Sequence, residues 1–197
     1  MNKRTLQGME TKKRLIECAL KLFREKGYNS VTVDDIVKEA NSSKGGFYTH
    51  FKTKEEILIN MLPLVDDAYV AFLNTGIKPE NSIEKISLFI QQVFKIIKEE
   101  IGLVFISTIY SSQIKDLLKD RFLISSDRAY NQILKKLIEE GQEKKEIKRE
   151  FTPEHAAAIL TSCIRGVVYD WCLFKGEFDL VDYGNEVINM MLNQLKL

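Results

Sequence analysis

The segment from Thr32 to Lys54, TVDDIVKEANSSKGGFYTHFKTK, constrains the fold more than any other part of the chain. Thr32 is followed three residues later by Asp35, a capping-box pattern that predicts the start of a helix. The apolar residues of this helix recur at helical spacing and predict one buried face: Val33, Ile36, Val37 and Ala40. The sequence Asn41-Ser42-Ser43 then ends the pattern. Asn tolerates the left-handed conformation of a tight corner, and either serine can cap the next helix.

The second short helix, from Lys44 to about Phe51, contains two adjacent glycines, Gly45 and Gly46. Each costs about 1 kcal/mol relative to alanine in a helix. A helix that gives up this much stability favours a close approach of its backbone to another molecule, and a phosphate backbone is a good candidate. Phe47 and Phe51 are predicted to anchor the helix against its neighbours.

The other side chains of this helix suit a nucleic acid. Lys44 and Tyr48 lie one turn apart and can reach base edges or phosphates, and polar residues that follow can donate to phosphate: Thr49, His50, Lys52 and Thr53. Two short helices joined by a tight corner are typical of a DNA-binding helix-turn-helix.

At these residues the chain resembles TetR-family transcriptional regulators, from about Thr11 to Leu58. The resemblance lies in the stretches TKKRLIECALKLFREKGYNSVTV and SKGGFYTHFKTKEEIL. It implies base contacts from Lys44, Gly45 and Tyr48. It implies contacts to the DNA backbone from a further set: Thr32, Ser43, Thr49, His50, Lys52 and Lys54. Asp34 departs from the pattern, because some members carry a basic, base-contacting residue at that position.

The charge distribution agrees with a DNA-binding N-terminal part. Residues 1–54 hold 12 basic and 6 acidic side chains, so their net charge is 12 − 6 = +6. Residues 55–197 hold 17 basic and 22 acidic side chains, so theirs is 17 − 22 = −5. We therefore expect an all-α protein with a helix-turn-helix DNA-binding domain at residues 1–54 and a helical ligand-binding and dimerisation domain at residues 55–197.

The C-terminal part shows helical patterns throughout. They predict a long helix from Thr53 to about Asn74 with a kink or break at Pro63, and a helix from Arg121 to Glu140. The charged run at 143–150 predicts a solvated loop, and Asp66 and Asp67 are interpreted as exposed acids.

The last two predicted helices, about 153–174 and 181–195, point to a partner of the same kind. The first is apolar on two sides, so one side is expected to pack in its own domain and the other against a second chain. Two such helices from each chain predict a homodimer held by a four-helix bundle.

Aromatic and apolar residues of the middle helices are candidates for lining an effector pocket. Most of them are equally well explained as core: Phe72, Phe89, Phe94, Phe105, Ile109, Tyr110, Phe122, Tyr130 and Trp171. Their abundance favours an apolar or amphipathic effector, such as a lipophilic drug or a fatty-acyl compound, over a sugar or a nucleotide.

Other classes of protein receive little support. The sequence has neither an apolar run of roughly 18 residues nor the apolar core of a signal peptide, so a cytoplasmic location is expected. Cys18, Cys163 and Cys172 suggest neither a disulfide framework nor a metal site. Cys18 is interpreted as a buried thiol, with redox sensing as the minor alternative. No catalytic constellation is present, and we predict no enzyme activity, cofactor or metal.

The leading hypothesis is thus a ligand-responsive DNA-binding regulator, which the resemblance implies is a repressor released from a palindromic operator by a small molecule. The alternative is a helical small-molecule-binding module without a DNA-binding role. The positive N-terminal domain and the set around Lys44 and Tyr48 argue against that alternative. A salt-dependent gel shift would separate the two.

Overall fold

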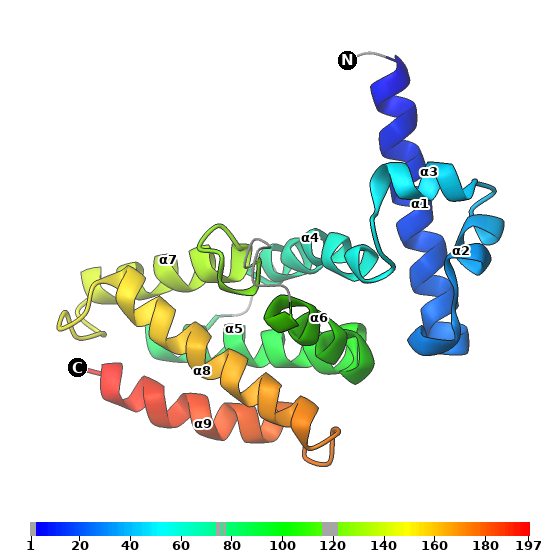
Figure 1. The fold of residues 1–197 in the computed structure, drawn as a ribbon. Helices are drawn as coiled ribbons and strands as arrows, with labels where there is room; N and C mark the ends of the chain where they lie inside the picture. Colours follow the sequence, from blue (N-terminus) through cyan, green and yellow to red (C-terminus); the bar gives the residue numbers. More distant parts are fainter. Residues whose placement is uncertain (1–2, 74–75, 77, 116–121) are drawn as a thin grey trace. The chain divides into compact units, whose positions relative to one another are not determined.

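The chain folds into helices that form two units, Met1–Pro63 and Leu64–Leu197, named here the head unit and the body unit (Figure 1). The structure is a computed structural model and describes residues 3–73, 76, 78–115 and 122–197. The boundary between the units falls after the predicted position at 54/55, because the start of the fourth helix belongs to the head unit. Ile57 and Leu58 in that segment are fully buried.

The head unit is built around a long first helix. Its elements are α1 (Lys3–Lys26), a 3-10 turn (Tyr28–Ser30), α2 (Val33–Glu39), α3 (Lys44–His50) and the first part of α4 (Glu55–Leu73). Helix α1 contacts both α2 and α3. Leu15, Ala19 and Phe23 of α1 are buried, which gives the two short helices an apolar support.

The body unit begins within α4 and continues through five more helices among the described residues. They are α5 (Ser82–Ile96), extended by a π-helical turn (Ile97–Ile101), then α6 (Leu103–Lys115), a 3-10 turn (Phe122–Ile124), α7 (Ala129–Glu143), α8 (Pro153–Leu173) and α9 (Leu180–Leu195). Helix α5 packs against α7 and α9, and α8 also packs against α7 and α9 (Figure 1). The buried side chains between these four helices form the main core of the unit.

Helix α4 runs unbroken from Glu55 to Leu73, so the predicted break at Pro63 does not occur. Its predicted end at Asn74 lies outside the described residues. The interpretation of Asp66 as an exposed acid is wrong, since its carboxylate accepts three hydrogen bonds, of 3.2, 3.0 and 2.8 Å, from the guanidinium of the buried Arg128. The sequence pattern around Asp66 and Asp67 could not reveal a partner 62 positions away.

The helix predicted from Arg121 to Glu140 begins later, at Ala129, and ends at Glu143. Arg121 lies outside the described residues. In the segment before Ala129, which is not part of this helix, side-chain amides of α7 satisfy two carbonyl groups. Asn131 Nδ2 donates to the Ser125 carbonyl at 2.6 Å, and Gln132 Nε2 donates to the Ser126 carbonyl at 2.7 Å.

The charged run at 143–150 forms a loop from Lys144 onward, as predicted, but it is not wholly solvated. Ile147 is fully buried, and an antiparallel bridge pairs it with Lys196 beside the end of α9. Its side chain lies so close to Gly141 that a Cβ there would meet Ile147 Cδ1 at 2.5 Å. The loop therefore ties α7 to the C-terminal end of the chain.

Helix α8 is long and apolar enough to cross a membrane by length and composition alone. In this structure it is a core element of the body unit, with Ala156, Leu160, Ile164, Val168 and Trp171 all buried. Thr152 caps it and Pro153 occupies its first turn, as the sequence predicted.

Candidate functional site

The corner between α2 and α3 is fixed by local hydrogen bonds that the sequence predicted. The backbone N–H of Thr32 donates to the Asp35 carboxylate at 2.8 Å, and the Asp35 N–H donates to the Thr32 hydroxyl at 3.2 Å, which completes the capping box. Asn41 adopts φ +46°, the left-handed conformation expected at the corner. Ser43 then caps α3 by accepting from the Gly46 N–H at 3.0 Å.

Helix α3 has a buried side and an exposed side. Phe47 and Phe51 are 0% and 1% exposed, with ring centroids 5.4 Å apart, which confirms them as the anchors of this helix. Tyr48 is 56% exposed and meets Phe47 edge-on, with ring centroids 5.4 Å apart. Tyr48 therefore presents its hydroxyl on the exposed side of a helix whose other side is anchored by Phe47 and Phe51.

The two glycines of α3 have different surroundings. A Cβ on Gly46 would meet the Ser42 hydroxyl oxygen at 2.8 Å, so a larger residue there would require the Ser42 side chain to move. A Cβ on Gly45 would meet nothing nearer than the Ser43 hydroxyl oxygen at 3.9 Å. Gly45 is thus not required by packing within the head unit, and it leaves an open backbone on the exposed side of α3.

Lys44 is held by an acid of the preceding helix. Its ammonium lies 2.8 Å from the carboxylate of Asp34 in the first turn of α2, and both side chains are more than 60% exposed. The Asp34 carboxylate raises the pKa of Lys44 by hydrogen bonding and by its charge, so Lys44 stays protonated. Lys44, which is predicted to contact bases, is therefore paired directly with Asp34, the acid that departs from the family pattern.

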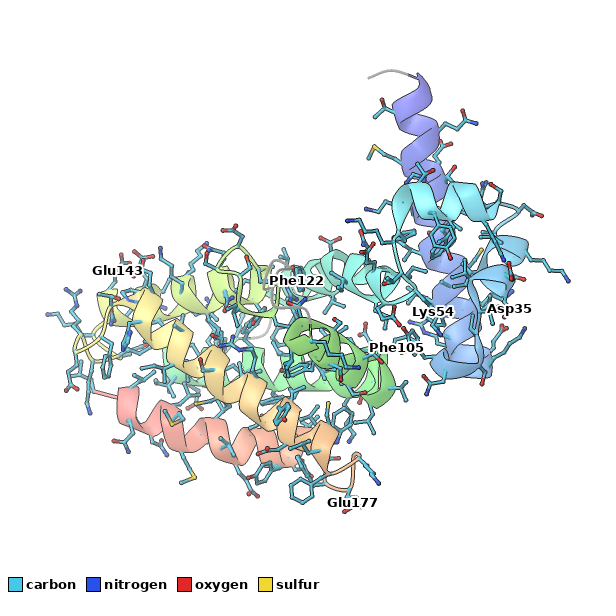
Figure 2. All side chains as sticks on the ribbon, in the orientation of Figure 1. Asp35, Lys54, Phe105, Phe122, Glu143 and Glu177 are labelled. Atoms are coloured by element: carbon cyan, nitrogen blue, oxygen red, sulfur yellow. The ribbon has the colours of Figure 1, made fainter. Side chains whose placement is uncertain are left out.

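The polar residues after Tyr48 do not share one role. The Thr49 hydroxyl donates to the Gly45 carbonyl within α3 at 2.8 Å, His50 is half-buried, and Lys52 is exposed. The Lys54 ammonium turns inward and donates to the carbonyls of Tyr28 and Val31 at 2.8 and 2.9 Å (Figure 2). In this conformation Lys54 supports the start of α4 and does not offer its ammonium to a phosphate.

Lys54 is part of a small structural cluster that sequence analysis missed. Its ammonium lies 4.1 Å from the ring centroid of Tyr28, a cation–π contact. The Tyr28 hydroxyl donates to the Glu55 carboxylate at 2.9 Å. Burial raises the pKa of Tyr28 above its ordinary value, and the Glu55 carboxylate adds to this, so the phenol stays protonated as the donor.

The residues predicted to line an effector pocket lie mostly inside the core of the body unit. Six of them are less than 10% exposed: Phe89, Phe94, Phe105, Ile109, Tyr130 and Trp171. Phe94 and Trp171 contact residues next to or within α9. A Cβ on Gly184 would meet the Phe94 ring at 2.5 Å, and the Trp171 indole N–H donates to the Phe178 carbonyl at 3.1 Å. Phe94 and Trp171 thus hold α9 in place.

Other members of the predicted set gather around the buried Arg128. Its guanidinium carbon lies 4.3 Å from the ring centroid of Phe122 and 5.1 Å from that of Tyr130. Tyr69 of α4 contacts Tyr130 and Phe89, with ring centroids 6.3 and 6.1 Å away. The structure therefore brings an aromatic cluster from α4, α5 and α7 together around one cation.

Among the described residues, two hollows of the body unit adjoin α8, one toward its N-terminal end and one toward its C-terminal end. The larger, of about 380 Å³, lies between α7 and α8 and contains the basic side chains Lys135 and Arg165. The other, of about 330 Å³, lies between α6 and α8 and is lined by Tyr110, Tyr169 and Cys172, among others. Tyr110 is the member of the predicted set that lines one of these two hollows. Its hydroxyl donates to the Arg165 carbonyl at 3.2 Å.

The fold and the exposed side of α3 together define a helix-turn-helix DNA-binding protein with a separate helical unit. Two family models match the chain. Residues 15–61 match the bacterial regulatory proteins of the tetR family, and residues 64–194 match the C-terminal region of YsiA-like proteins. The chain belongs to the TetR family of bacterial transcriptional regulators.

Individual relatives agree with this assignment. The chain is 25% identical to the fatty acid metabolism regulator protein of Bacillus subtilis over 91% of its own length and 92% of that relative. It is 45% identical to the transcriptional regulator YuxN of the same organism over 73 residues, which are 36% of this chain and 25% of YuxN. The TetR-family repressor FadR of Thermus thermophilus, solved in complex with lauroyl-CoA, shares the fold with a TM-score of 0.73 and 16% identity, covering 94% of this chain and 95% of FadR.

Proposed function

We propose that this protein is a repressor that binds a palindromic operator through α2 and α3 and is released by a small amphipathic molecule bound in the body unit. The observation that carries the DNA-binding part is the exposed side of α3, where Lys44, Gly45 and Tyr48 face away from the anchors Phe47 and Phe51. We assign the base contacts to these three exposed residues.

Contacts to the DNA backbone are assigned to the flanking polar residues: Thr32, Ser43, Thr49, His50 and Lys52. For Lys54 we propose a supporting role, because its ammonium is bonded to the carbonyls of Tyr28 and Val31. A base contact and a phosphate contact differ in their dependence on sequence and on salt.

Tyr48→Ala tests the assignment. We expect it to weaken operator binding by about 1–3 kcal/mol without a change in thermal stability, since the side chain is exposed. Lys52→Ala should weaken binding to all sequences alike and reduce the salt slope by about one. Lys95→Ala, an exposed lysine of α5 in the body unit, is the control and should leave binding unchanged. Normal operator binding by Tyr48→Ala would show that the assigned side of α3 is wrong.

We propose that the protein is a homodimer held by α8 and α9. Large apolar side chains are exposed along these two helices and at the turn between them: Tyr169, Leu173, Phe174, Tyr183 and Met190. A second copy of the chain would cover this surface and give two half-sites about one turn of DNA apart.

Met190→Asp tests the dimer, because Met190 is 72% exposed and contributes little to the core of one chain. Size-exclusion chromatography with light scattering should show a dimer for the wild type and a monomer for Met190→Asp. Gln91→Asp adds the same charge to a polar, exposed position of α5, outside the proposed surface, and is the matched control. A monomeric wild type at tens of micromolar would rule the dimer out.

For the effector we propose a fatty-acyl compound, and specifically an acyl thioester of coenzyme A. The aromatic residues around Arg128 would bind the acyl chain of the effector. The likeness to the Bacillus subtilis fatty acid metabolism regulator over 92% of its length supports a fatty-acyl effector. Thermal-shift assays with lauroyl-CoA, free coenzyme A and lauric acid test the class. We expect the largest stabilisation with lauroyl-CoA. No shift with acyl thioesters of short, medium or long chain would contradict the proposal.

Release of the operator by the effector requires coupling between the two units, and we propose α4 as the connector. The proposed location of the protein is the cytoplasm. The start of α4 is buried in the head unit through Ile57 and Leu58, and its later part in the body unit through Val65 and Tyr69. Coupling between two binding sites is reciprocal, so saturating operator must lower effector affinity by the same factor by which effector lowers operator affinity. Equal effector affinity with and without operator would exclude the coupling.

A further inference from the structure

The exposed ion pair between Asp34 and Lys44 has no evident role in stability. The two charged groups are 2.8 Å apart, but their side chains are 65% and 61% exposed. Exposed pairs of this kind contribute little, since water and salt screen them. Asp34 is also not needed to cap α2, because Asp35 performs that role with Thr32. The pair therefore needs another explanation.

The position of the pair provides one. Asp34 lies in the first turn of α2 and Lys44 is the first residue of α3, so the pair joins the two helices on the exposed side of the corner. Tyr48, one helical turn after Lys44, is exposed as well. A ligand that contacts Lys44 and Tyr48 must therefore also meet the carboxylate of Asp34.

A lysine ammonium next to a carboxylate presents a donor beside an acceptor. In the major groove, a G·C pair presents the complementary pattern, with the O6 and N7 acceptors of guanine beside the N4 amino donor of cytosine. An A·T pair offers its donor between two acceptors and places a methyl group at one edge. The side-by-side arrangement of Asp34 and Lys44 fits G·C better, because the ammonium can bind both guanine acceptors.

We propose that Asp34 is a specificity-determining residue and that Asp34 and Lys44 together contact one G·C pair in each half-site. Lys44 donates to guanine while Asp34 accepts from the amino group of cytosine. This inference rests on the proposed DNA contacts of α3.

Asp34 would also act against incorrect sites. Its negative charge is repelled by phosphates, which weakens binding to DNA of any sequence. Where the groove offers only hydrogen-bond acceptors near α2, the Asp34 carboxylate, itself an acceptor, finds no donor on the DNA. Lys44 then keeps its bond to Asp34. Only a site with partners for both Asp34 and Lys44 is bound tightly. Asp34 therefore lowers the affinity for DNA of random sequence and increases the preference for the correct site.

The test is selection of double-stranded DNA from a random library by the full-length protein, followed by binding measurements at several salt concentrations. Asp34→Ala and Asp34→Asn remove the charge, and the latter keeps the side-chain shape. Glu39→Ala is the matched control. It removes another acid of α2 that forms an exposed ion pair, 2.8 Å from Lys21, but away from Lys44.

We expect the wild type to select a half-site with a fixed G·C pair. Asp34→Ala and Asp34→Asn should lose about tenfold in discrimination at that position and bind random DNA more tightly, while Glu39→Ala keeps the wild-type preference. If the Asp34 variants select the same sequence as the wild type, or relax only at an A·T pair, the inference is overturned and the DNA-binding proposal stands. If the wild type selects no sequence at all, both fail.

Discussion

The head unit and the body unit use the same kinds of side chain in opposite ways. In α3 of the head unit, Phe47 is fully buried and its neighbour Tyr48 is 56% exposed, so the anchor and the proposed contact residue are adjacent in the sequence. In the body unit the aromatic residues Phe89 and Phe94 of α5 are buried, and exposed ones such as Tyr169 and Tyr183 lie on α8 and α9. An exposed aromatic side chain is accessible to another molecule, whereas a buried one is accounted for by packing.

The ion pairs show the same contrast. Lys44 and Asp34 in the head unit are mostly exposed, while Arg128 and Asp66 in the body unit are 6% and 19% exposed. Screening makes the first pair weak and available to another molecule. The second pair is largely removed from water, so each charge depends on the other. The comparison predicts that the head unit tolerates loss of its pair and the body unit does not.

The largest effect is expected for Arg128→Ala, which leaves the Asp66 carboxylate without its partner. We expect a loss of about 3 kcal/mol in the free energy of unfolding, measured by urea denaturation. Lys85→Ala, which breaks the partly exposed pair with Glu140, is the control and should cost less than about 1 kcal/mol. The double change Asp66→Leu with Arg128→Met should cost less than Arg128→Ala alone. Equal losses for Arg128→Ala and Lys85→Ala would remove the contrast between the pairs.

Gly184→Ala is expected to have the next largest effect. Its new methyl group would lie 2.5 Å from the Phe94 ring, and overpacking of this kind costs about 1–3 kcal/mol. Gly166→Ala adds the same methyl group to α8, where nothing lies within 4 Å, and should not destabilise the chain. Thermal unfolding of both variants checks this difference, and a stable Gly184→Ala would show that α5 and α9 are not closely packed there.

The two glycines of α3 give a smaller effect on stability that is opposite in sign to the effect on binding. Gly45→Ala should stabilise the head unit by up to about 1 kcal/mol, because alanine favours the helix and has space. The same change should weaken operator binding, since the methyl group would face the DNA in the proposed complex. Gly46→Ala meets the Ser42 hydroxyl and should gain less stability. Wild-type operator affinity for Gly45→Ala, measured by fluorescence anisotropy, would count against close approach at this residue.

The smallest functional effect is expected for the cysteines. Burial raises the pKa of Cys18 in the head unit, and it raises the pKa of Cys172 in the body unit to about 11. At pH 8 roughly one Cys172 thiol in a thousand is therefore the reactive thiolate. Labelling of native Cys172 with iodoacetamide should be slow at pH 8 and accelerate toward pH 11. Mild peroxide should leave operator binding unchanged, and a loss of binding would revive the redox-sensing alternative.

Local patterns predicted the head unit well because its features are determined by neighbours in sequence. The capping box at Thr32 and Asp35, the left-handed Asn41 and the anchors Phe47 and Phe51 all depend on residues a few positions apart. The inward turn of Lys54 was not predicted, because its partners Tyr28 and Val31 lie 26 and 23 positions away.

The body unit was predicted as helices but not as a packing arrangement. Ile147 is buried in the middle of a charged run, and it pairs with Lys196 beside the distant end of α9. Gly184 appears in the sequence as an ordinary helix interruption, although its absent side chain makes room for Phe94.

The sequence by itself determined the all-helical fold, the helix-turn-helix and the residues on the exposed side of α3, because helical periodicity and capping act over three or four positions. Only the tertiary structure decided which charges pair and which aromatic residues are core. Arg128 pairs with Asp66, and Lys44 pairs with Asp34, because the folded chain brings separate elements together. Burial and pairing depend on distances in space, and short-range patterns in a sequence carry no record of those distances.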